Sequence, residues 1–249
     1  MKKSIVKVQW EEKTRGWKAS LLLATREGFE HLQLSPGRKF SFEITGERRC
    51  TGYAPAPGER AKCPEFRQLE EGSQCPECRG KDIYAGYVRG DKQNDLDGEF
   101  SVYLAQISDE VKVGVTRSEN VPKRWIEQGA DYAVEILEGL SSKVALENEE
   151  ELSNNGLTER IRKEEKTSQA TSPEKLEKVV EEKDFDGEIV DVNAQTVYPD
   201  LKGDFKRGGL FEGELEAVKG QIIGNGRIAL GLTSGKVLER PKQKGLDSF

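Results

Sequence analysis

The chain has 249 residues, of which 34% are charged and 35% hydrophobic, and its formal net charge is −6. This length suits one large domain or two modest ones, and the hydrophobic content lies above the range of disordered chains. The acidic balance argues against a protein that coats nucleic acid non-specifically through its overall charge, but a local basic groove is compatible with it.

Nothing in the sequence indicates a membrane protein. No apolar run approaches the roughly 18 residues that a membrane-spanning helix requires. The beginning, Met1-Lys2-Lys3, leads into a short apolar stretch that Lys7 interrupts, which is unlike a secretory signal. We therefore expect a cytoplasmic protein with reduced thiols and no membrane partner.

Residues 1–49 read as strands. Apolar residues recur at alternate positions near 5–10 and 40–44, and a third apolar run covers 21–23. Leu34-Ser35-Pro36-Gly37 has the Pro-Gly signature of a tight turn. The pattern predicts an N-terminal β segment.

The four cysteines, Cys50, Cys63, Cys75 and Cys78, lie in a segment rich in Gly, Pro and charge. Cys75 and Cys78 form a C-x₂-C knuckle, which lets two thiolates bind one tetrahedral ion with Zn–S bonds of about 2.3 Å. Disulfides are the alternative, but a cytosolic chain keeps its thiols reduced. We expect a structural zinc that orders residues 50–78 and leaves no coordination position for catalysis.

Residues 100–139 show the clearest pattern of secondary structure in the sequence. Pro122 suits the first turn of a helix, and Gly129 suits the position just beyond its end. Two strands, this short helix and a third strand are predicted at 100–105, 111–115, about 122–128 and 133–137.

The remaining chain is polar. Residues 142–163 are helix-prone and acidic, and 164–184 read as a charged linker in which Ser172-Pro173-Glu174 is a good helix start. We expect that helix to be an exposed bridge between two lobes. Short strands separated by Gly, Asn and Asp form a small β unit from Phe185, and a polar tail follows Arg240.

These elements predict an α+β fold whose parts pack around each other. The predicted parts are a β segment with the zinc-stapled insertion at 1–99, a β-β-α-β unit at 100–163, a charged helical linker at 164–184, and a small β unit with its tail at 185–249.

The central unit resembles the core of the GIY-YIG endonuclease superfamily. Ser101-Val102-Tyr103 and Lys112-Val113-Gly114 are separated by eight residues and match the two tripeptides on that core's paired strands, while Arg124 lies on the following helix. Lys112 stands where the classical motif has its second tyrosine.

This resemblance implies roles on a phosphodiester. Tyr103 would orient or deprotonate the attacking water, and Lys112 and Arg124 would stabilise the phosphorane charge. Gly114 would let the substrate or the helix approach the backbone closely. Two further cations, Arg117 and Lys123, are expected to bind phosphate beside Arg124. With Lys112 and Arg124 they form a basic patch. The alternative is that these cations lie on a solvated edge of strand, loop and helix.

A GIY-YIG nuclease also needs a glutamate that holds one Mg²⁺ or Mn²⁺. The acidic helix offers several, and we select Glu149 because it fits an E-x-x-L pattern best. Its neighbours Glu147 and Glu150 are the alternatives.

Over nearly its full length the chain resembles the prokaryotic family catalogued as domain of unknown function 2797. The cysteine cluster, the runs 102–105, 111–117 and 121–130, then Tyr198-Pro199 and 213–223, follow that family's order. Ile222 stands where the family usually has a tyrosine. The resemblance implies a common fold and no particular activity.

We expect a zinc-containing protein that binds DNA or RNA and, if Mg²⁺ or Mn²⁺ completes the site, hydrolyses a phosphodiester. The alternative is a non-catalytic module whose basic patch docks nucleic acid or an acidic protein partner. A purely protein-binding scaffold, which the net acidity favours, would bind its partner independently of salt. No P-loop, strand-linked G-x-G-x-x-G or spare Cys/His pair indicates another chemistry.

Overall fold

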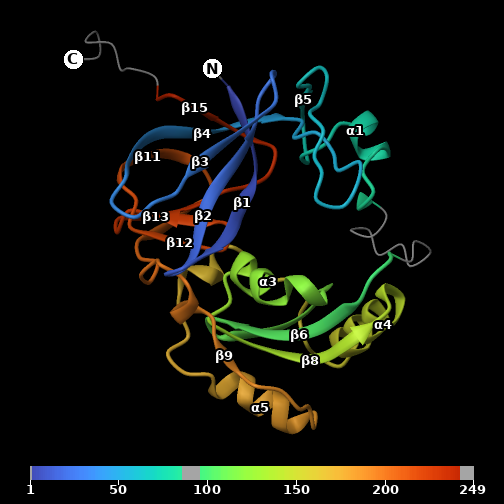
Figure 1. The fold of residues 1–249 in the computed structure, drawn as a ribbon. Coiled ribbons are helices and arrows are strands. Elements are labelled where there is room, and N and C mark those ends of the chain that lie inside the picture. The colour runs from blue at the N-terminus through green and yellow to red at the C-terminus, as the bar shows by residue number, and fades with distance from the viewer. Residues whose placement is uncertain (1, 86–95, 242–249) are drawn as a thin grey trace.

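Strands dominate this α+β fold, in agreement with the fold class expected from the sequence. The computed structural model describes residues 2–85 and 96–241, which form three sheets. Figure 1 shows an upper lobe made from both ends of the chain and a lower lobe made from its middle.

The upper lobe is built on a seven-stranded sheet with the order β11-β4-β15-β1-β2-β3, and β5 also pairs with β4. Its strands are β1 Lys3–Lys13, β2 Gly16–Ala24, β3 Phe29–Gln33, β4 Lys39–Arg49, β5 Gln68–Leu69, β11 Gly209–Glu214 and β15 Lys236–Glu239. Because β15 lies between β1 and β4, the parts predicted at 1–99 and 185–249 share one sheet.

The residues of β1 explain its central place in that sheet. Ile5 and Val8 enter the main core, whereas Val6 faces a smaller cluster with Phe66. A register irregularity between Ile5 and Lys7 lets residues three apart face the same side, as a β-bulge does. Both faces of β1 are therefore partly covered.

The lower lobe contains a four-stranded sheet with the order β7-β6-β8-β9. Its elements are β6 Phe100–Ile107, β7 Glu110–Arg117, α3 Val121–Gln128, β8 Tyr132–Leu140, α4 Ser142–Asn154, α5 Glu174–Glu182 and β9 Val190–Asp191. β6 is buried over its whole length because Tyr103 and Ala105 pack in the cluster that includes α3, whereas Val102 and Leu104 pack with α4 and α5.

Helix α3 lies where the two lobes meet (Figure 1). Pro122 stands in its first turn and Gly129 ends it in the left-handed conformation, with φ 73°. Its Trp125 and Ile126 belong to the same hydrophobic core as Trp10 of the upper lobe. The lobes therefore share a core at this helix.

The helix predicted to continue from 142 to 163 is shorter than expected, and this part of the prediction was wrong. α4 stops at Asn154, and Gly156 follows with φ 98°, a conformation that only glycine adopts readily. Beyond it the chain runs along the edge of β7, where Val113 N donates a hydrogen bond to Thr158 O at 2.9 Å.

Helix α5 also departs from the prediction of an exposed bridge. Leu176 is fully buried, and Val179 and Val180 pack beside it against the sheet of the lower lobe. The thin apolar stripe was long enough to bury one face, which a solvated bridge would leave exposed.

A third sheet, with the order β10-β14-β13-β12, completes the upper lobe. Its strands are β10 Asp204–Lys206, β12 Ala217–Lys219, β13 Ile222–Gly224 and β14 Ile228–Gly231. Short elements elsewhere are α1 Pro76–Gly80 and the 3₁₀ turns η1 Ser118–Asn120, η2 Glu165–Thr167 and η3 Asn193–Gln195.

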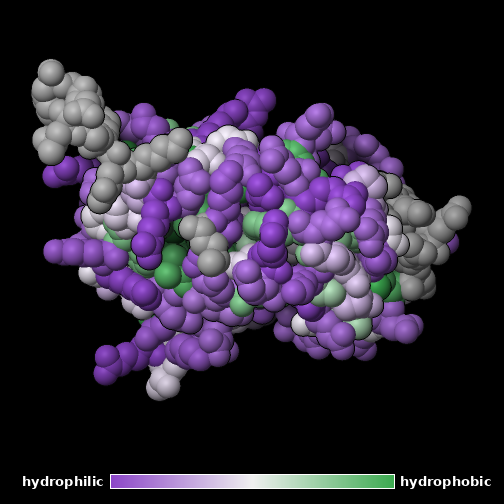
Figure 2. All heavy atoms as spheres, turned by 90° about the horizontal axis from the view of Figure 1, so that it is seen from above, coloured by the Kyte–Doolittle hydropathy of each residue, from purple (hydrophilic) through white to green (hydrophobic). Residues whose placement is uncertain are grey.

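The surface is polar, as the composition leads one to expect. Seen from above, Figure 2 shows mostly hydrophilic residues with small hydrophobic spots between them. No helix in the described ranges is long and apolar enough to cross a membrane. The polar tail predicted after Arg240 lies, from residue 242 onward, outside the described residues.

Candidate functional site

The four cysteines converge on one point. Cys50 follows β4, and Cys75 and Cys78 frame the start of α1. All four side chains are buried, and their Sγ atoms lie within 4.8 Å of one another. A tetrahedral ion with Zn–S bonds of about 2.3 Å would set the sulfurs about 3.8 Å apart. The Cys63 and Cys75 sulfurs are 4.0 Å apart, so the donor set fits zinc.

Backbone N–H groups are directed at the sulfurs. Cys78 N lies 3.5 Å from Cys75 Sγ, and Cys75 N lies 3.2 Å from Cys50 Sγ. Such contacts orient metal ligands and disperse thiolate charge. Burial raises the pKa of Cys50 to about 11, so a bound cation is needed to hold its thiolate at neutral pH.

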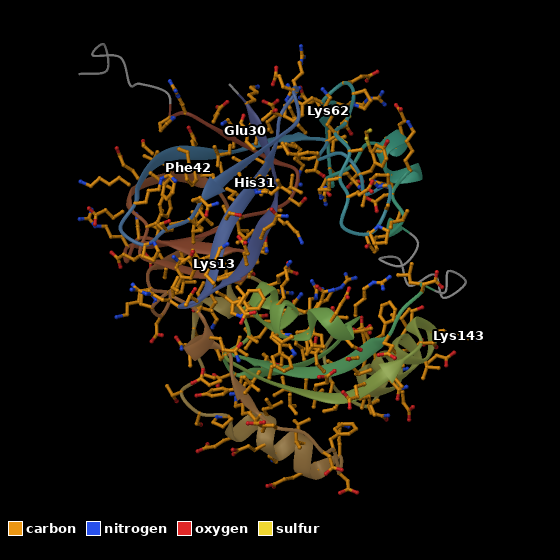
Figure 3. All side chains as sticks on the ribbon, in the orientation of Figure 1. Lys13, Glu30, His31, Phe42, Lys62 and Lys143 are labelled. Carbon is orange, nitrogen blue, oxygen red and sulfur yellow. The ribbon has the colours of Figure 1, made fainter. Side chains whose placement is uncertain are left out.

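The segment that carries the four cysteines, residues 50–78, has little core of its own, and we call it the cysteine module. Tyr53 and Leu69 are the partly buried hydrophobic residues packed on the cysteines. Pairing of β5 with β4 and the buried Phe66 fasten the module to the upper lobe. Lys62, labelled in Figure 3, adds hydrogen bonds to the carbonyls of Arg26 and Glu27. The metal would therefore supply most of the order inside the module.

A second cluster lies at the edge of the lower sheet, where β7 meets α3 and α4. Tyr103 pairs directly with Gly114, and Ala105 pairs with Lys112. Since alternate residues of a strand share a face, Tyr103 and Lys112 project from the same side of the sheet. This is the arrangement expected from the two tripeptides.

Gly114 makes room for the ring of Tyr103. A Cβ at this position would lie 2.5 Å from both Cζ and Oη of Tyr103. The tyrosine ring therefore lies directly across Gly114, and any larger residue would displace it. Tyr103 therefore makes the close approach that this glycine permits in the structure.

Arg124 reaches this face from α3. It donates a hydrogen bond to the Tyr103 hydroxyl. Burial raises the pKa of Tyr103, and the positive charge of Arg124 and this hydrogen bond oppose that rise. Its guanidinium lies 3.6 Å from Glu127, and the Gln128 side-chain oxygen, in the amide orientation that satisfies both groups, accepts from it at 3.0 and 3.2 Å. The side chain keeps 41% of its surface exposed.

Lys112 is nearly buried, with 5% of its surface exposed. Its Nζ donates to Glu159 O at 2.7 Å. Burial lowers the pKa of Lys112 to about 8, and the positive charge of Arg124 acts in the same direction, whereas Glu149 opposes it. Lys112 and Arg124 are thus close enough to repel each other.

Glu149 is the α4 glutamate that lies near these cations. Its carboxylate accepts a hydrogen bond from the Val115 backbone, and burial raises its pKa while Lys112 acts to lower it. The alternatives Glu147 and Glu150 are exposed. The structure therefore brings Tyr103, Lys112, Arg124 and Glu149 together.

Two predicted phosphate-binding residues are not part of this cluster. Arg117 lies over the Phe100 ring at 5.3 Å, on the sheet face opposite Tyr103, because strand residues an odd number apart face opposite sides. Lys123 is half-buried on α3, and its charge is not among the main causes of the pKa shifts of Lys112 and Arg124.

Sequence reasoning missed Lys166. Its Nζ donates to Gln128 O at 2.8 Å, and its pKa is lowered to about 8 by burial first and then by Lys112 and Arg124. The residue falls at the start of the predicted linker. The one available signal was the cation-rich stretch from Arg160 to Lys166.

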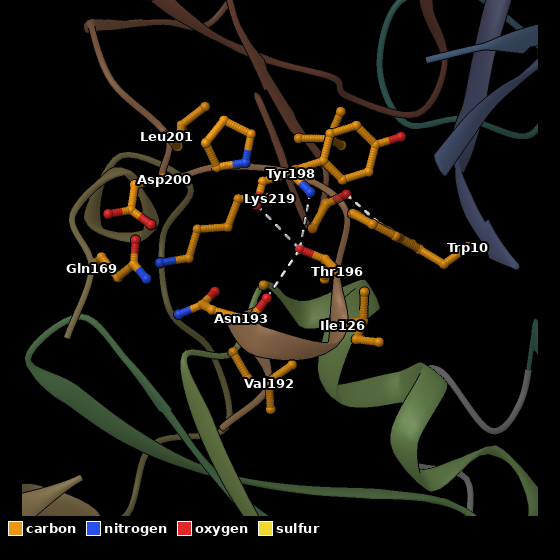
Figure 4. Close-up of a pocket in the computed structure, with 15 residues that line it drawn as sticks. Trp10, Ile126, Gln169, Val192, Asn193, Thr196, Tyr198, Asp200, Leu201 and Lys219 are labelled. Atoms are coloured by element: carbon orange, nitrogen blue, oxygen red, sulfur yellow. Dashed lines mark hydrogen bonds between the residues drawn. The ribbon is translucent and has the colours of Figure 1, made fainter. Parts of the chain in front are cut away.

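A pocket lies at the C-terminal end of α3 and contains none of the predicted site residues (Figure 4). Lys219 lines this pocket and forms a 2.6 Å ion pair with the fully buried Asp131. The Asp131 carboxylate also accepts from Asn193 at 3.0 Å and from the backbone of Ser108 and Ala170. Both carboxylate oxygens of Asp131 therefore accept hydrogen bonds from groups inside the protein. The pair of Asp131 and Lys219 thus holds segments of both lobes together.

Comparison with known families decides where the chain belongs. A family model matches residues 37–224, which contain the four cysteines, the cluster at β7 and most of the C-terminal strands. The chain belongs to that family, DUF2797. The family is described as a protein of unknown function. This confirms the wider resemblance seen in the sequence. No curated protein and no solved structure matches the DUF2797 chain, and the GIY-YIG likeness is not shown.

Proposed function

We propose that this DUF2797 protein binds the phosphodiester backbone of DNA or RNA at the cluster of Tyr103, Lys112, Arg124 and Glu149, with the cysteine module holding a structural zinc. The proposal rests on the proximity of two cations from different elements. Lys112 of β7 and Arg124 of α3 lie close together on one side of the sheet. A phosphate between them would relieve their repulsion.

Both cations have donors to spare. An ammonium has three N–H donors, and Lys112 uses one on Glu159 O. Arg124 presents a planar fork of donors and is partly exposed. Phosphate oxygens accept such charge-assisted hydrogen bonds, which are about twice as strong as neutral ones.

Replacing Arg124 with alanine is expected to weaken nucleic-acid binding in a salt-dependent way. One lost phosphate contact should reduce the slope of log K against log salt by about 0.7 for a single strand and about 0.9 for a duplex. Binding of labelled DNA and RNA would be titrated at several salt concentrations, at mildly acidic pH, where Lys112 with its pKa of about 8 is protonated.

Arg227→Ala is the matched control, because Arg227 is an exposed arginine in the turn between β13 and β14. It should bind with the affinity and salt slope of the unaltered protein. If the unaltered protein binds neither DNA nor RNA at low salt, or if both variants behave alike, the proposal is wrong.

Phosphodiester hydrolysis is a second candidate, favoured by the Tyr103 hydroxyl beside Arg124 and by the charge of Glu149 nearby. Mg²⁺ is held in many sites by one or two carboxylates together with substrate phosphates. Glu149 would supply one carboxylate. Because the charges of Lys112 and Arg124 nearby repel a metal ion, the ion would bind mainly together with a phosphate, which neutralises them. Such a cation would act as a Lewis acid on the phosphate.

If the site is catalytic, Tyr103→Phe should lose most of the cleavage rate and keep nearly all of the binding, since the hydroxyl would act on the attacking water. Tyr132→Phe on β8 is the matched control. Single- and double-stranded DNA and RNA would be incubated with Mg²⁺ or Mn²⁺. Binding without cleavage across that panel would leave the non-catalytic module. An unchanged rate in Tyr103→Phe would exclude the assigned role.

A further inference from the structure

A series of cations leads away from Arg124 at the junction of the two lobes into the upper lobe. We name Lys166, Lys163, Lys236 and Arg48 the basic path. They come from the segment after α4, from β15 and from β4, so no single element groups them. Each is half-buried, neither fully exposed nor enclosed.

Hydrogen bonds fix the first part of the path. Arg124 and Lys166 both bind Gln128, through its side chain and its carbonyl respectively. Three residues before Lys166, Lys163 donates to Thr233 Oγ1 at 3.1 Å and to the carbonyl of Leu232. The path therefore crosses from α3 to the loop before β15.

The second part continues from that loop to the cysteine module. Lys236 N donates to Thr233 O at 3.1 Å, and its Nζ donates to Arg207 O at 2.6 Å. Arg48 donates to Ser234 O at 3.2 Å and to Gly72 O, within the module, at 2.8 Å. Neighbouring cations are thus linked from Arg124 to the border of the module.

These cations have few carboxylates to neutralise them. Glu164 lies between Lys163 and Lys166 in sequence but pairs with Arg207 at 2.7 Å, and Glu47 pairs with Lys2 and Arg49. Burial and then the charge of Lys236 lower the pKa of Lys163 to about 8. The path is therefore a line of positive charge in an acidic protein.

We propose that a nucleic-acid strand bound at Arg124 continues along the basic path, so that Lys166, Lys163, Lys236 and Arg48 bind successive phosphates up to the border of the cysteine module. This extends the proposed function and rests on it. The path ends at Arg48, because Glu70 and Glu71 directly precede Gly72 and would repel a further phosphate. The lysine bonds to carbonyls leave at least one ammonium donor free on each residue.

The test compares strand lengths. A trinucleotide and a dodecanucleotide, each as single-stranded DNA and RNA, would be titrated against the unaltered protein, Lys163→Met, Lys166→Met and the control Lys178→Met. Lys178 is an exposed lysine on α5, and its side chain is 75% exposed. Melting temperatures would show which variants fold, and two path variants are used because each lysine also binds a carbonyl.

We expect the dodecanucleotide to have a steeper salt dependence than the trinucleotide. Lys163→Met should weaken the dodecanucleotide roughly fivefold and lower its slope by about 0.7, with the trinucleotide unchanged. Lys178→Met should change neither. If Arg124→Ala weakens binding but folded path variants bind the dodecanucleotide normally, the inference is wrong and the proposed function stands. If the unaltered protein binds no oligonucleotide, both are wrong.

Discussion

Cys78→Ser should abolish zinc binding and disorder the cysteine module. The four sulfurs fit one tetrahedral ion, and Tyr53 and Leu69 are the hydrophobic residues that pack on the cysteines. Binding of structural zinc is worth about 10–16 kcal/mol in zinc-finger peptides at neutral pH, and in such sites it doubles as folding free energy. Metal analysis should fall from about one zinc per chain to nearly none, and limited proteolysis should cut within the module.

Glu77→Gln is the control for this change, because Glu77 lies between the two knuckle cysteines but its carboxylate pairs with Lys81 on the surface. It should keep its zinc, since an exposed ion pair contributes little to stability. An unaltered protein that holds no zinc while its module stays resistant to protease would contradict the zinc assignment, as would stoichiometric zinc in Cys78→Ser.

Asp131→Asn should destabilise the protein strongly, by about 3–5 kcal/mol, because it leaves Lys219 as an unpaired buried charge. The two side chains are 0% and 8% exposed. The carboxylate now accepts hydrogen bonds from Ser108 N and Ala170 N, and the NH₂ group of the new amide would face these donors without an acceptor between them. Chemical denaturation would measure the loss in the free energy of unfolding.

Asp109→Asn removes a comparable ion pair at the surface, with Lys175 at 3.0 Å and both side chains more than half exposed. It should cost less than about 1 kcal/mol. Adding Lys219→Met to Asp131→Asn should recover part of the lost stability, since no buried charge then remains. If Asp131→Asn unfolds as readily as Asp109→Asn, the pair does not hold the lobes together.

The sequence predicted the elements whose signals are local. The alternation in β6 and β7, Pro122 in the first turn of α3 and Gly129 at its end are visible in a few residues each, and all occur in the structure. The knuckle of Cys75 and Cys78 likewise predicted the cysteine cluster. Such features depend on short-range chemistry that a single sequence carries.

Long-range pairing was not predictable in the same way. Nothing local places β15 between β1 and β4, or turns Leu176 into the lower core. The same limit explains the misplacement of Arg117, since its side of the sheet depends on strand register. Lys166 was missed because its contact with Gln128 joins residues far apart in the chain.

The central claim is that nucleic acid binds where Tyr103, Lys112, Arg124 and Glu149 meet. Amide NMR shifts of the labelled protein, followed during titration with a trinucleotide, test it most directly. The account predicts the largest shifts in β6, β7, the first turns of α3 and the middle of α4. Shifts confined to α5, or to the pocket beside Lys219, would contradict it.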